Sequence, residues 1–555
     1  MTNVLVTCGG GFQGLGLVRA LLASGGLQSF VCDVHADNPV RYLAHHYLVG
    51  PPLADANAYA TFLLETTRRE RIEFVLPATA LDLRILASLR TDLRDLGAIA
   101  GVCSQPLLDT LLDKAATRRW LIEAQLPAPE SIDPYRHDYS CPLLGKPIAG
   151  WGGRGLEMIN SREEMESRFV AIDPDAYVWS RLLEHFQEYS ADFAIGITGG
   201  VSPIVVRRRT RTSGGFAIVS ESVRNPVLNA LFLDLANTLA QSDGRGCFNA
   251  QVIVPQSRQV APFISDVNPR IGTSATHALA EGINLPHWFI QSAHSPALCT
   301  PPLRPLVKSV RMLSDLTLPV LAHRPGGVIF DLDDTLVDHK RWLLAKMRAL
   351  YEARFRDLAD GDDYLRTAVQ LIDDHEWPHL VDRMLELLGL PSTLRAETIR
   401  CYRAIEIPET PLFDDVAPTL SALRQSQLKI AILTDNPPAT QKSKIAHAPL
   451  LRDVDATVFS QECGGEKPNP AAFAEAVRML DLPADQLIMV GDNWMRDGAG
   501  AIRAGLAHAF IVRRAPGSSL CSRHFANRDT HEAAGMVSEV PNLTAMLHAC
   551  LDARP

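Results

Sequence analysis

Short apolar runs alternate with amphipathic stretches near the N-terminus. Residues 3–8 (NVLVTC) and 29–33 (SFVCD) are apolar runs of strand length, and a glycine-rich turn and the amphipathic segment 17–26 lie between them. This order predicts a strand, a turn, a helix and a second strand. Residues 72–80 and 81–97 repeat the pattern of strand and helix. We therefore expect an α/β fold whose strands form one sheet.

The pattern changes at about residue 106, where a helical segment runs to Gln125 and stops before two prolines. Prolines are then concentrated between Ser295 and Pro325, which indicates a connection between domains. A second α/β pattern begins at Gly326 and is interrupted by a long helical stretch. The predicted organisation is a domain over 1–105, a domain over 106–295, a linker over 296–325, a domain over 326–515 with a helical insertion at about 338–411, and a C-terminal extension over 516–555.

The composition is typical of a globular protein, with 46% apolar and 21% charged residues in a chain of 555. A net charge of −9 gives no basic surface for nucleic acid. No apolar stretch reaches the length that a bilayer requires, and the cysteines are scattered singly without a CxxC pair. We expect a cytoplasmic enzyme that acts on small molecules, with neither nucleic acid nor membrane as a partner. A homodimer is left open.

The first turn matches a dinucleotide fingerprint. Gly9, Gly11 and Gly14 form a GxGxxG pattern after a predicted strand, and Asp33 ends the next strand. In a dinucleotide-binding domain, such glycines let a pyrophosphate approach the backbone. The same glycines also suit any tight turn between a strand and a helix. An NAD-dependent oxidoreductase therefore stays open as an alternative.

A lysine and a glycine-rich loop follow in the second predicted domain. Lys146 ends a short strand-like segment, and PIAGWGGRG follows it directly. Backbone N–H groups of such a loop can donate to phosphate oxygens, and the lysine can reach the phosphates as a point charge. The glycines of this loop are Gly150, Gly152, Gly153 and Gly155. The segment is a candidate site for a nucleoside triphosphate.

Oxygen ligands lie on two later strands. Gln251 is part of FNAQVIV, and Asp266 and Asn268 are part of FISDVNPR, where strand alternation places the two on one face. Hard oxygen donors of this kind suit Mg²⁺. Arg270, two residues further on, would point to the same site and could neutralise a phosphoryl group during its transfer.

These segments resemble the ATP-grasp family, in particular its carbamoyl-phosphate-synthetase-like branch. The resemblance covers residues 1–295 and rests on DKAATRRWL, GKPIAGWGGRG, LLEHFQEYSADF, NAQVIV and DVNPR in the family's order. It implies that residues 1–105 form the Rossmann-like domain that precedes many ATP-grasp modules, and that residues 106–295 form the α+β ATP-grasp domain that binds the nucleotide. ATP and Mg²⁺, with Mn²⁺ as an alternative ion, are the implied cofactors.

The resemblance also assigns roles to single residues. Lys114 and Lys146 would hold the nucleotide phosphates, and Glu188 would hold the ribose hydroxyls. The implied metal ligands are Gln251, Asp266 and Asn268. The family more often has Glu where this chain has Asp266, so the shorter side chain puts the position of one metal ion in doubt.

An arginine-rich strand lies between these motifs. Arg207, Arg209 and Arg211 would share one face of a strand. That face could clamp a carboxylate or a phosphate through paired N–H donors, or it could be a solvated surface. We expect it to bind the substrate. The neighbouring residues 213–216 (SGGF) could form a mobile lid.

A second set of phosphate-handling residues begins in GGVIFDLDDTLVDH. Its apolar strand ends at Asp331 and Asp333, which alternation places on one side. One carboxylate can attack phosphorus while the other manages the proton of the leaving group. Because two carboxylates repel a phosphate dianion, a cation is also required.

Three later segments complete this set. Thr434 ends the apolar run KIAILT and can donate a hydrogen bond to a phosphoryl oxygen. Lys467 in GGEKPNP supplies a positive charge. Asp492 and Asp497 follow another apolar strand and provide magnesium ligands. The predicted metal ligands of this half are Asp331, Asp333, Asp492 and Asp497.

This order of motifs resembles the haloacid dehalogenase superfamily over residues 326–515. The resemblance implies a Rossmannoid sheet with a helical cap, an aspartyl-phosphate at Asp331, and Asp333 as the acid and then the base. Trp342, Arg348 and Tyr351, together with Arg354, could contact the leaving group. Packing or solvation of their helix explains most of these four residues equally well.

The two sets predict a bifunctional biosynthetic enzyme. An ATP-dependent carboxylate–amine ligase would form an acyl phosphate and then an amide or peptide bond. A Mg²⁺-dependent phosphatase would act on a phosphorylated substrate or product, and in the simplest scheme one of the coupling partners carries that phosphate. The alternatives are an NAD-dependent oxidoreductase joined to a phosphatase, and a non-catalytic binding module in place of the ligase.

Overall fold

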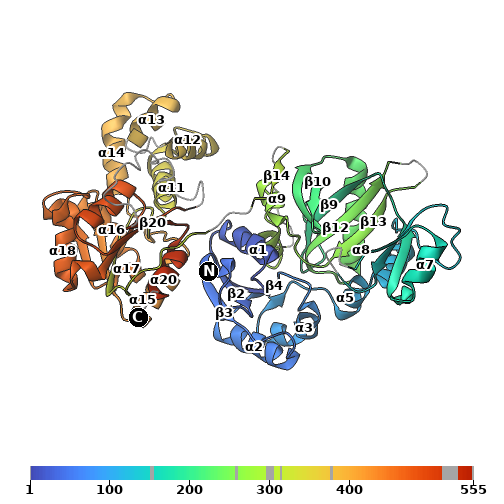
Figure 1. Cartoon of the computed structure of the whole chain (residues 1–555). Helices are drawn as coiled ribbons and strands as arrows, with labels where there is room; N and C mark the ends of the chain where they lie inside the picture. The colour runs from blue at the N-terminus through green and yellow to red at the C-terminus, as the bar shows by residue number, and fades with distance from the viewer. Residues whose placement is uncertain are drawn as a thin grey trace. The chain divides into compact units, whose positions relative to one another are not determined.

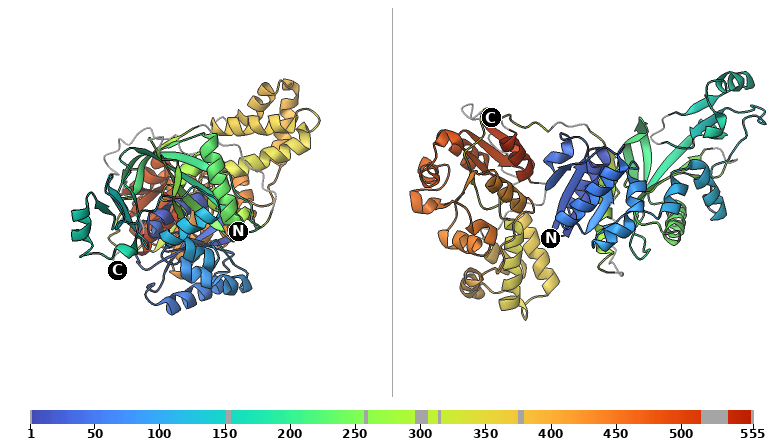
Figure 2. Two further views of the ribbon diagram at one scale, coloured as in Figure 1. Left: turned by 90° about the vertical axis from the view of Figure 1, so that its right-hand side faces the viewer. Right: turned by 90° about the horizontal axis from the view of Figure 1, so that it is seen from below.

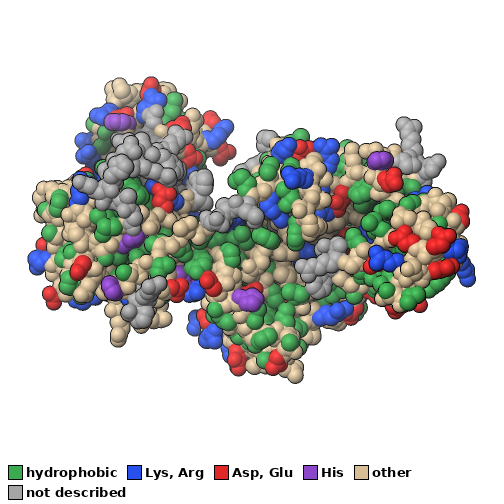
Figure 3. Space-filling model, in the orientation of Figure 1, with side chains coloured by type: hydrophobic (Ala, Val, Ile, Leu, Met, Phe, Trp, Pro, Cys, Tyr) green, Lys and Arg blue, Asp and Glu red, His purple; other side chains and the backbone are tan. Residues whose placement is uncertain are grey.

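The chain divides into two compact units, Met1–Asp315 and Leu316–Pro555 (Figure 1). The computed structural model describes residues 2–150, 155–256, 260–295, 306–312, 316–374, 379–514 and 536–552. None of the helices in these ranges has the length and apolar character needed to cross a membrane. Acidic and basic side chains are interspersed over the face seen in Figure 3.

The first unit begins with a parallel sheet in the order β3-β2-β1-β4-β5. Its strands are β1 (Thr2–Thr7), β2 (Leu27–Asp33), β3 (His46–Val49), β4 (Phe74–Pro77) and β5 (Ile99–Ala100), and its helices are α1 (Phe12–Leu22), α2 (Ala56–Arg69), α3 (Leu83–Ser88) and α4 (Arg90–Asp95). The apolar runs of β1 and β4 are buried on both faces, as expected for a parallel sheet. The single helix expected over 81–97 is wrong, because the chain forms two short helices that meet at Leu89.

A six-stranded antiparallel sheet follows in the order β13-β12-β9-β10-β11-β14, beside a three-stranded sheet in the order β7-β6-β8. The strands are β6 (Leu143–Pro147), β7 (Glu157–Ile159), β8 (Tyr177–Arg181), β9 (Phe186–Ile195), β10 (Val205–Ser213), β11 (Phe216–Ser222), β12 (Gly246–Pro255), β13 (Phe263–Asn268) and β14 (Lys308–Val310). The helices of this part are α5 (Gln105–Leu111), α6 (Lys114–Glu123), α7 (Arg162–Arg168), α8 (Pro226–Gln241), α9 (Ala275–Ala280) and α10 (Leu285–Gln291). Phe193, Phe232 and Phe248 are fully buried between α8 and the large sheet.

The strand β14 comes from the predicted linker and forms an edge of the large sheet. Ser309 pairs with Ser220 of β11, and its hydroxyl lies 2.7 Å from Nδ1 of the buried His277. Arg311 donates to the carbonyl of Thr273 at 2.7 Å. Part of the connecting segment is therefore built into the first unit.

The second unit contains a parallel sheet in the order β17-β16-β15-β18-β19-β20. Its strands are β15 (Gly327–Phe330), β16 (Lys429–Thr434), β17 (Ala456–Phe459), β18 (Leu487–Gly491), β19 (His508–Val512) and β20 (Val537–Val540), and its main helices are α15 (Val416–Gln425), α16 (Pro438–Ala446), α18 (Pro470–Leu480) and α20 (Leu543–Leu551). The central strand β15 pairs with β16 on one side and β18 on the other. The carboxyl ends of these three strands meet at one edge, where a site is expected in an open α/β sheet.

A helical cap is inserted after β15, and in both views of Figure 2 it forms a group of helices of its own, drawn in yellow. Its helices are α11 (His339–Leu350), α12 (Gly361–Asp373), α13 (Leu380–Leu387) and α14 (Arg395–Ala404). Arg354 donates hydrogen bonds from its two terminal guanidinium nitrogens to the carboxylate of Glu397, and the hydroxyl of Tyr351 donates to the carbonyl of Ala359. These two residues therefore stabilise the cap itself.

Candidate active sites

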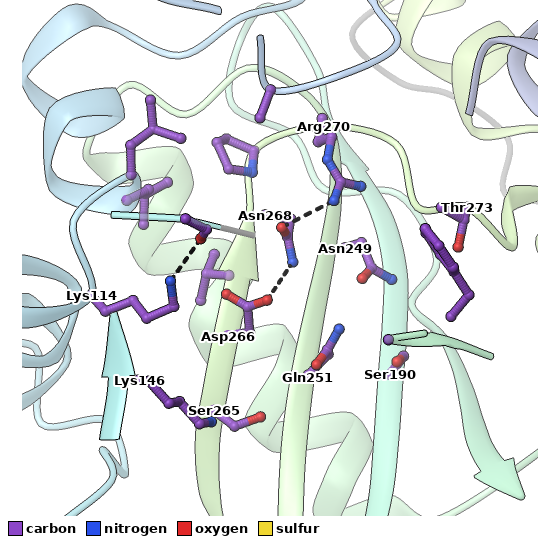
Figure 4. A pocket seen from close by; sticks show the side chains of 18 of the residues that line it. Lys114, Lys146, Ser190, Asn249, Gln251, Ser265, Asp266, Asn268, Arg270 and Thr273 are labelled. Carbon is purple, nitrogen blue, oxygen red and sulfur yellow. Dashed lines mark hydrogen bonds between the residues drawn. The ribbon is translucent and has the colours of Figure 1, made fainter. Parts of the chain in front are cut away.

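The first unit contains a cavity of about 540 Å³ that brings most of its predicted site residues together (Figure 4). Its lining includes Lys114, Lys146, Gly150, Glu188, Arg207, Arg209, Asn249, Gln251, Asp266, Asn268 and Arg270. These residues come from helix α6, from strands of both the small and the large sheet, and from the segments that follow β6 and β13. The cavity is large enough for a small-molecule ligand.

Two lysines lie on one side of this cavity. Lys114 is the first residue of α6, and its ammonium donates to the carbonyl of Gly150 at 2.7 Å. Burial lowers the pKa of Lys114, while the carboxylate of Asp266 and other charges modify it. Lys146 reaches the cavity from β6 (Figure 4). Gly150 has a φ of +140°, a conformation that suits glycine, whereas Gly152 and Gly153 lie outside the described residues.

The predicted oxygen ligands face one another across two antiparallel strands. Gln251 of β12 lies opposite Asp266 of β13, and the amide of Asn268 donates to Asp266 at 2.9 Å. Arg270 donates to the side-chain oxygen of Asn268 at 3.3 Å. Asn249, which the sequence reasoning missed, lies two residues before Gln251 on the same strand and lines the same cavity. This donor set of carboxylate and amide oxygens fits Mg²⁺.

Two of the three predicted arginines of β10, Arg207 and Arg209, form ion pairs with carboxylates of the protein. Arg207 is 3% exposed and donates to Asp192 at 2.9 Å. Arg209 forms an ion pair with Glu188 and donates to the carbonyl of Gly215 at 2.6 Å. The carboxylate of Glu188, which the family resemblance assigns to ribose binding, is therefore held by an arginine in this structure.

Arg211 does not follow the predicted alternation. The pairing of β10 with β11 is irregular between Arg209 and Thr212, and a bulge of this kind shifts the side chains that follow it to new directions. Arg211 is exposed and is not among the residues that line the cavity. The prediction of one face for the three arginines is wrong at this residue. The adjoining Gly214 and Gly215 form the tight turn of the β10–β11 hairpin, with φ of +56° and +79°.

The glycine turn at the N-terminus has a packing explanation. A Cβ on Gly14 would lie 1.9 Å from the carbonyl oxygen of Gly9, so no side chain fits there. The N–H of Gly10 donates to Asp33 at 2.8 Å. The fingerprint residues thus hold β1, α1 and β2 together whether or not a dinucleotide binds.

The second unit places its site at the carboxyl edge of the parallel sheet. The ammonium of Lys467 lies 2.6 Å from Oδ1 of Asp331 and 2.6 Å from Oδ1 of Asp497. Carboxylate oxygens of Asp331, Asp492 and Asp497 lie within 4.8 Å of one another. Burial raises the pKa of Asp331, Lys467 opposes this shift, and the two neighbouring carboxylates reinforce it.

This cluster fits a divalent cation. Lys467 pairs with two of the three carboxylates, Asp331 and Asp497, and three carboxylate oxygens at this spacing are ligands that Mg²⁺ prefers. Asp497 is additionally fixed by the backbone N–H of Asn493 at 2.9 Å. Bound Mg²⁺ would offset the repulsion between the carboxylates and a phosphate dianion.

Asp333 lies outside this cluster and has a different set of partners. Lys444 lies 2.6 Å from its Oδ1, and Gln441 and Asn436 donate to its Oδ2 at 3.0 and 3.1 Å. Burial alone would raise the pKa of Asp333, but the Lys444 ammonium and the other partners hold it well below its ordinary range. The prediction that its side chain belongs to the metal cluster is therefore wrong among the described residues, because nitrogen donors surround it.

Thr434 is buried at the end of β16. Its hydroxyl accepts a hydrogen bond from Gln441 at 2.7 Å and donates to the carbonyl of Asp435 at 3.2 Å. Asp435 also accepts from the N–H of Lys467 at 3.0 Å and from Ser460 at 2.7 Å. Asp435 and Ser460 thus fix the loop that carries Lys467.

Comparison with known proteins agrees with this geometry. Residues 326–505 match the family model of haloacid dehalogenase-like hydrolases. A ribulose-1,5-bisphosphate 5-phosphatase from Halopiger xanaduensis is 34% identical over 195 residues, which cover 32% of this chain and 82% of the relative. This half of the chain belongs to the haloacid dehalogenase-like hydrolases. A glyceraldehyde 3-phosphate phosphatase from Methanopyrus kandleri is 29% identical over 197 residues, or 34% of this chain and 84% of that protein.

Solved structures with similarity to the chain include a carboxylase and a ligase. A biotin carboxylase from Campylobacter jejuni has a TM-score of 0.46 at 13% identity and covers 58% of this chain and 76% of its own. An L-amino acid ligase from Bacillus licheniformis has a TM-score of 0.42 at 15% identity and covers 59% of this chain and 83% of its own. The function of the first unit is argued from the residues of its cavity.

The haloacid dehalogenase-like site contains residues that the sequence reasoning missed. Gln441 and Lys444 are three residues apart on α16, directly after the strand that ends at Thr434, and both contact Asp333. Their helical spacing was visible in the sequence, but nothing in it showed which face of α16 meets Asp333. His339, at the start of the cap helix α11, lies 3.8 Å from the same carboxylate.

Proposed function

We propose that the chain is an ATP-dependent carboxylate–amine ligase joined to a Mg²⁺-dependent phosphatase. The observation that supports the ligase most is that two lysines, three oxygen ligands and an arginine line one cavity. These residues are Lys114, Lys146, Gln251, Asp266, Asn268 and Arg270. The phosphatase rests on family membership and on the contacts of Lys467 with Asp331 and Asp497.

In the ligase reaction, a carboxylate of the first substrate attacks the γ-phosphorus of ATP, and ADP leaves. The amine of the second substrate then attacks the acyl carbon, and phosphate leaves as the amide forms. Lys114 and Lys146 bind the phosphates, and Arg270 neutralises charge on the group in transfer. Mg²⁺ held by Gln251, Asp266 and Asn268 would supply charge neutralisation on the phosphate oxygens.

In the phosphatase reaction, a carboxylate oxygen of Asp331 attacks phosphorus and the alcohol leaves with a proton that Asp333 delivers. Because its partners keep Asp333 ionised in this structure, Asp333 must take up this proton when the negatively charged substrate binds beside it. Asp333 then takes a proton from water, which attacks the aspartyl-phosphate and releases inorganic phosphate. Lys467 neutralises charge at Asp331, and Thr434 donates to a phosphoryl oxygen. The cap restricts the access of water to this site.

The joining of the two activities favours a phosphorylated coupling partner. A phosphatase next to a ligase is harmless only if its substrate differs from ATP and from the acyl phosphate. A partner that arrives with a phosphate, and loses it after coupling, meets this condition and makes the sequence irreversible. The arginines are not assigned to this phosphate, since Asp192 and Glu188 already balance Arg207 and Arg209.

A pair of substitutions tests the two sites separately. Lys146→Ala should abolish ADP formation and retain hydrolysis of 4-nitrophenyl phosphate, because the lysine belongs to the first cavity only. Asp331→Asn should abolish that hydrolysis and retain ADP formation, because it removes the nucleophile at nearly constant volume. Loss of both activities in a folded variant of either kind would exclude two independent sites.

One observation favours a non-catalytic binding module as the second candidate for the first unit. Among the described lining residues, the carboxylates are Glu188 and Asp266, and Glu188 is paired with Arg209. A metal ion would thus have a single carboxylate ligand there. An ADP-release screen of carboxylates against amines with the Asp331→Asn chain separates the two candidates, and a binding module would release no ADP with any pair. Thermal shifts with NAD and with Mg-ATP test the remaining oxidoreductase alternative.

A further inference from the structure

The cap helix α11 carries a buried lysine that the catalytic scheme does not use. Lys346 is 6% exposed, and its ammonium lies 4.3 Å from the ring centre of Tyr402 and 5.1 Å from that of Trp342. Within the described part of the chain, no carboxylate or carbonyl lies within hydrogen-bonding distance of this ammonium. Aromatic faces offset only part of the cost of removing an ammonium from water.

A second buried lysine links this site to the catalytic centre. Lys444 from the core helix α16 is 2% exposed at its side chain and lies 4.3 Å from the ring centre of Trp342. The same ammonium lies 2.6 Å from Oδ1 of Asp333. Lys346 and Lys444 therefore contact one indole ring, and the path from Asp333 to Lys346 leads from the core into the cap.

The contacts of Lys346 lead to the side of the catalytic centre from which the alcohol leaves. In the proposed mechanism the phosphoryl group is bound at Asp331 beside Lys467, and Asp333 delivers the proton to the oxygen that leaves. The rest of the leaving alcohol is therefore expected on the Asp333 side of the site. Lys444 contacts both Asp333 and Trp342, and Trp342 lies against Lys346, so these contacts run from Asp333 to Lys346.

The local charges favour an anion at this place. Burial, and then repulsion by Lys444, lower the pKa of Lys346 to about 8. Burial lowers the pKa of the neighbouring His339 to about 4, so that its imidazole is neutral at pH 7. Burial raises the pKa of Tyr402 to about 12, so that its phenol is neutral as well. Among the described residues, two ammonium groups lie near one ring and a single carboxylate, that of Asp333, contacts them, so one positive charge is left without an anion.

We propose that Lys346, with Lys444 and the rings of Trp342 and Tyr402, binds an anionic group on the leaving alcohol of the phosphatase substrate. The proposal rests on the phosphatase activity proposed above. The anion is a carboxylate or a second phosphate, because both place oxygen acceptors against an ammonium. The two rings line the path of the carbon chain that joins this anion to the phosphoryl group.

Matched substrates test this assignment on the full-length chain. One pair is 3-phosphoglycerate and glycerol 3-phosphate, which differ by a carboxylate, and another is fructose 1,6-bisphosphate and fructose 6-phosphate, which differ by a phosphate. The wild type should prefer the anionic member of at least one pair. Lys346→Met, which keeps the length of the side chain and removes its charge, should lower kcat/KM for that member by roughly 10- to 100-fold, mainly through KM. For the neutral members and for 4-nitrophenyl phosphate, the change should stay within about threefold, since they do not use the ammonium.

A control on another cap helix separates this site from a general charge effect. Arg400 is exposed on α14, so Arg400→Met removes a positive charge from the cap and leaves the ammonium of Lys346 in place, and it should leave all these rates within about threefold of the wild type. Equal losses for neutral and anionic substrates in Lys346→Met, or the absence of any preference in the wild type, would overturn the anion site. Failure of the wild type to hydrolyse 4-nitrophenyl phosphate with Mg²⁺ would instead reject the phosphatase itself.

Discussion

Replacement of Lys346 by methionine should stabilise the second unit, because the wild-type protein buries an ammonium at a cost. The pKa of this group falls from 10.5 to about 8 on folding, and a tenfold change in a protonation equilibrium corresponds to about 1.4 kcal/mol. The cost is therefore about 3 kcal/mol, of which the contacts with Trp342 and Tyr402 return about 1 kcal/mol. Since methionine has no charge to bury and fills nearly the same volume, we expect a net gain of about 2 kcal/mol.

The gain should depend on pH in a defined direction. The folded-state pKa lies below the unfolded-state pKa, so folding expels a proton between these values and the cost is complete below pH 8. As pH rises from about 8 towards 10.5, the wild-type amine becomes neutral in both states and the advantage of methionine disappears. Among the described residues, Lys444 from α16 and Tyr402 from α14 are the titratable groups that face Lys346, and the neutral form of Tyr402 persists through this window.

Calorimetry of the whole chain measures this effect. Leu480→Ala, which empties a fully buried position of α18, should lower only the transition of the second unit and thereby identify it. In Lys346→Met the same transition should rise by roughly 4–8 °C at pH 7, and the rise should shrink at pH 10. A lower transition temperature, or a gain that is the same at both pH values, would refute the reasoning.

Three further substitutions test other parts of the structure. Gly14→Ala should destabilise the first unit by more than about 3 kcal/mol, because its Cβ would lie 1.9 Å from the carbonyl oxygen of Gly9; denaturant unfolding measures this, and a neutral effect would contradict the packing explanation. Arg207→Met should cost about 3–5 kcal/mol in the same assay because it leaves Asp192 buried without its partner, and adding Asp192→Asn should recover part of the loss; an exposed pair would show neither effect. Asp331→Asn, supplied with ATP and the correct partners, should accumulate a phosphorylated amide that mass spectrometry detects, and a product without phosphate would contradict the proposed order of steps.

The local sequence pattern was sufficient to predict the positions of site residues that lie at the ends of strands. Asp331 and Thr434 directly follow or end short apolar runs, and such runs form buried parallel strands whose carboxyl ends meet at one edge. The side-by-side position of Asp266 and Asn268 followed in the same way from the period of a strand. For these residues, the direction of the side chain and the identity of its neighbours follow from the geometry of a β-strand.

Contacts between residues far apart in the chain could not be predicted from the sequence. The ion pair of Arg207 with Asp192 depends on the register between β10 and β9. The position of Arg211 outside the cavity depends on an irregularity in the pairing of β10 with β11. Likewise, the contact of Lys444 with Asp333 joins residues 111 positions apart. Registers and helix faces of this kind are set by packing, and a single sequence does not display them.

Because of the edge strand β14, a cut in the connecting segment would break the covalent chain without separating the two fragments. It reaches β11 from beyond residue 305 and is held there by main-chain pairing, by Ser309 at His277, by Lys308 at Glu221 and by Arg311 at Thr273. A protease that cuts between residues 296 and 305 would therefore produce two fragments on a gel. In solution the second fragment would stay attached through β14, as a donated strand that completes the sheet of the first. Release of the phosphatase unit after such a cut would require the removal of one β-strand from its neighbour.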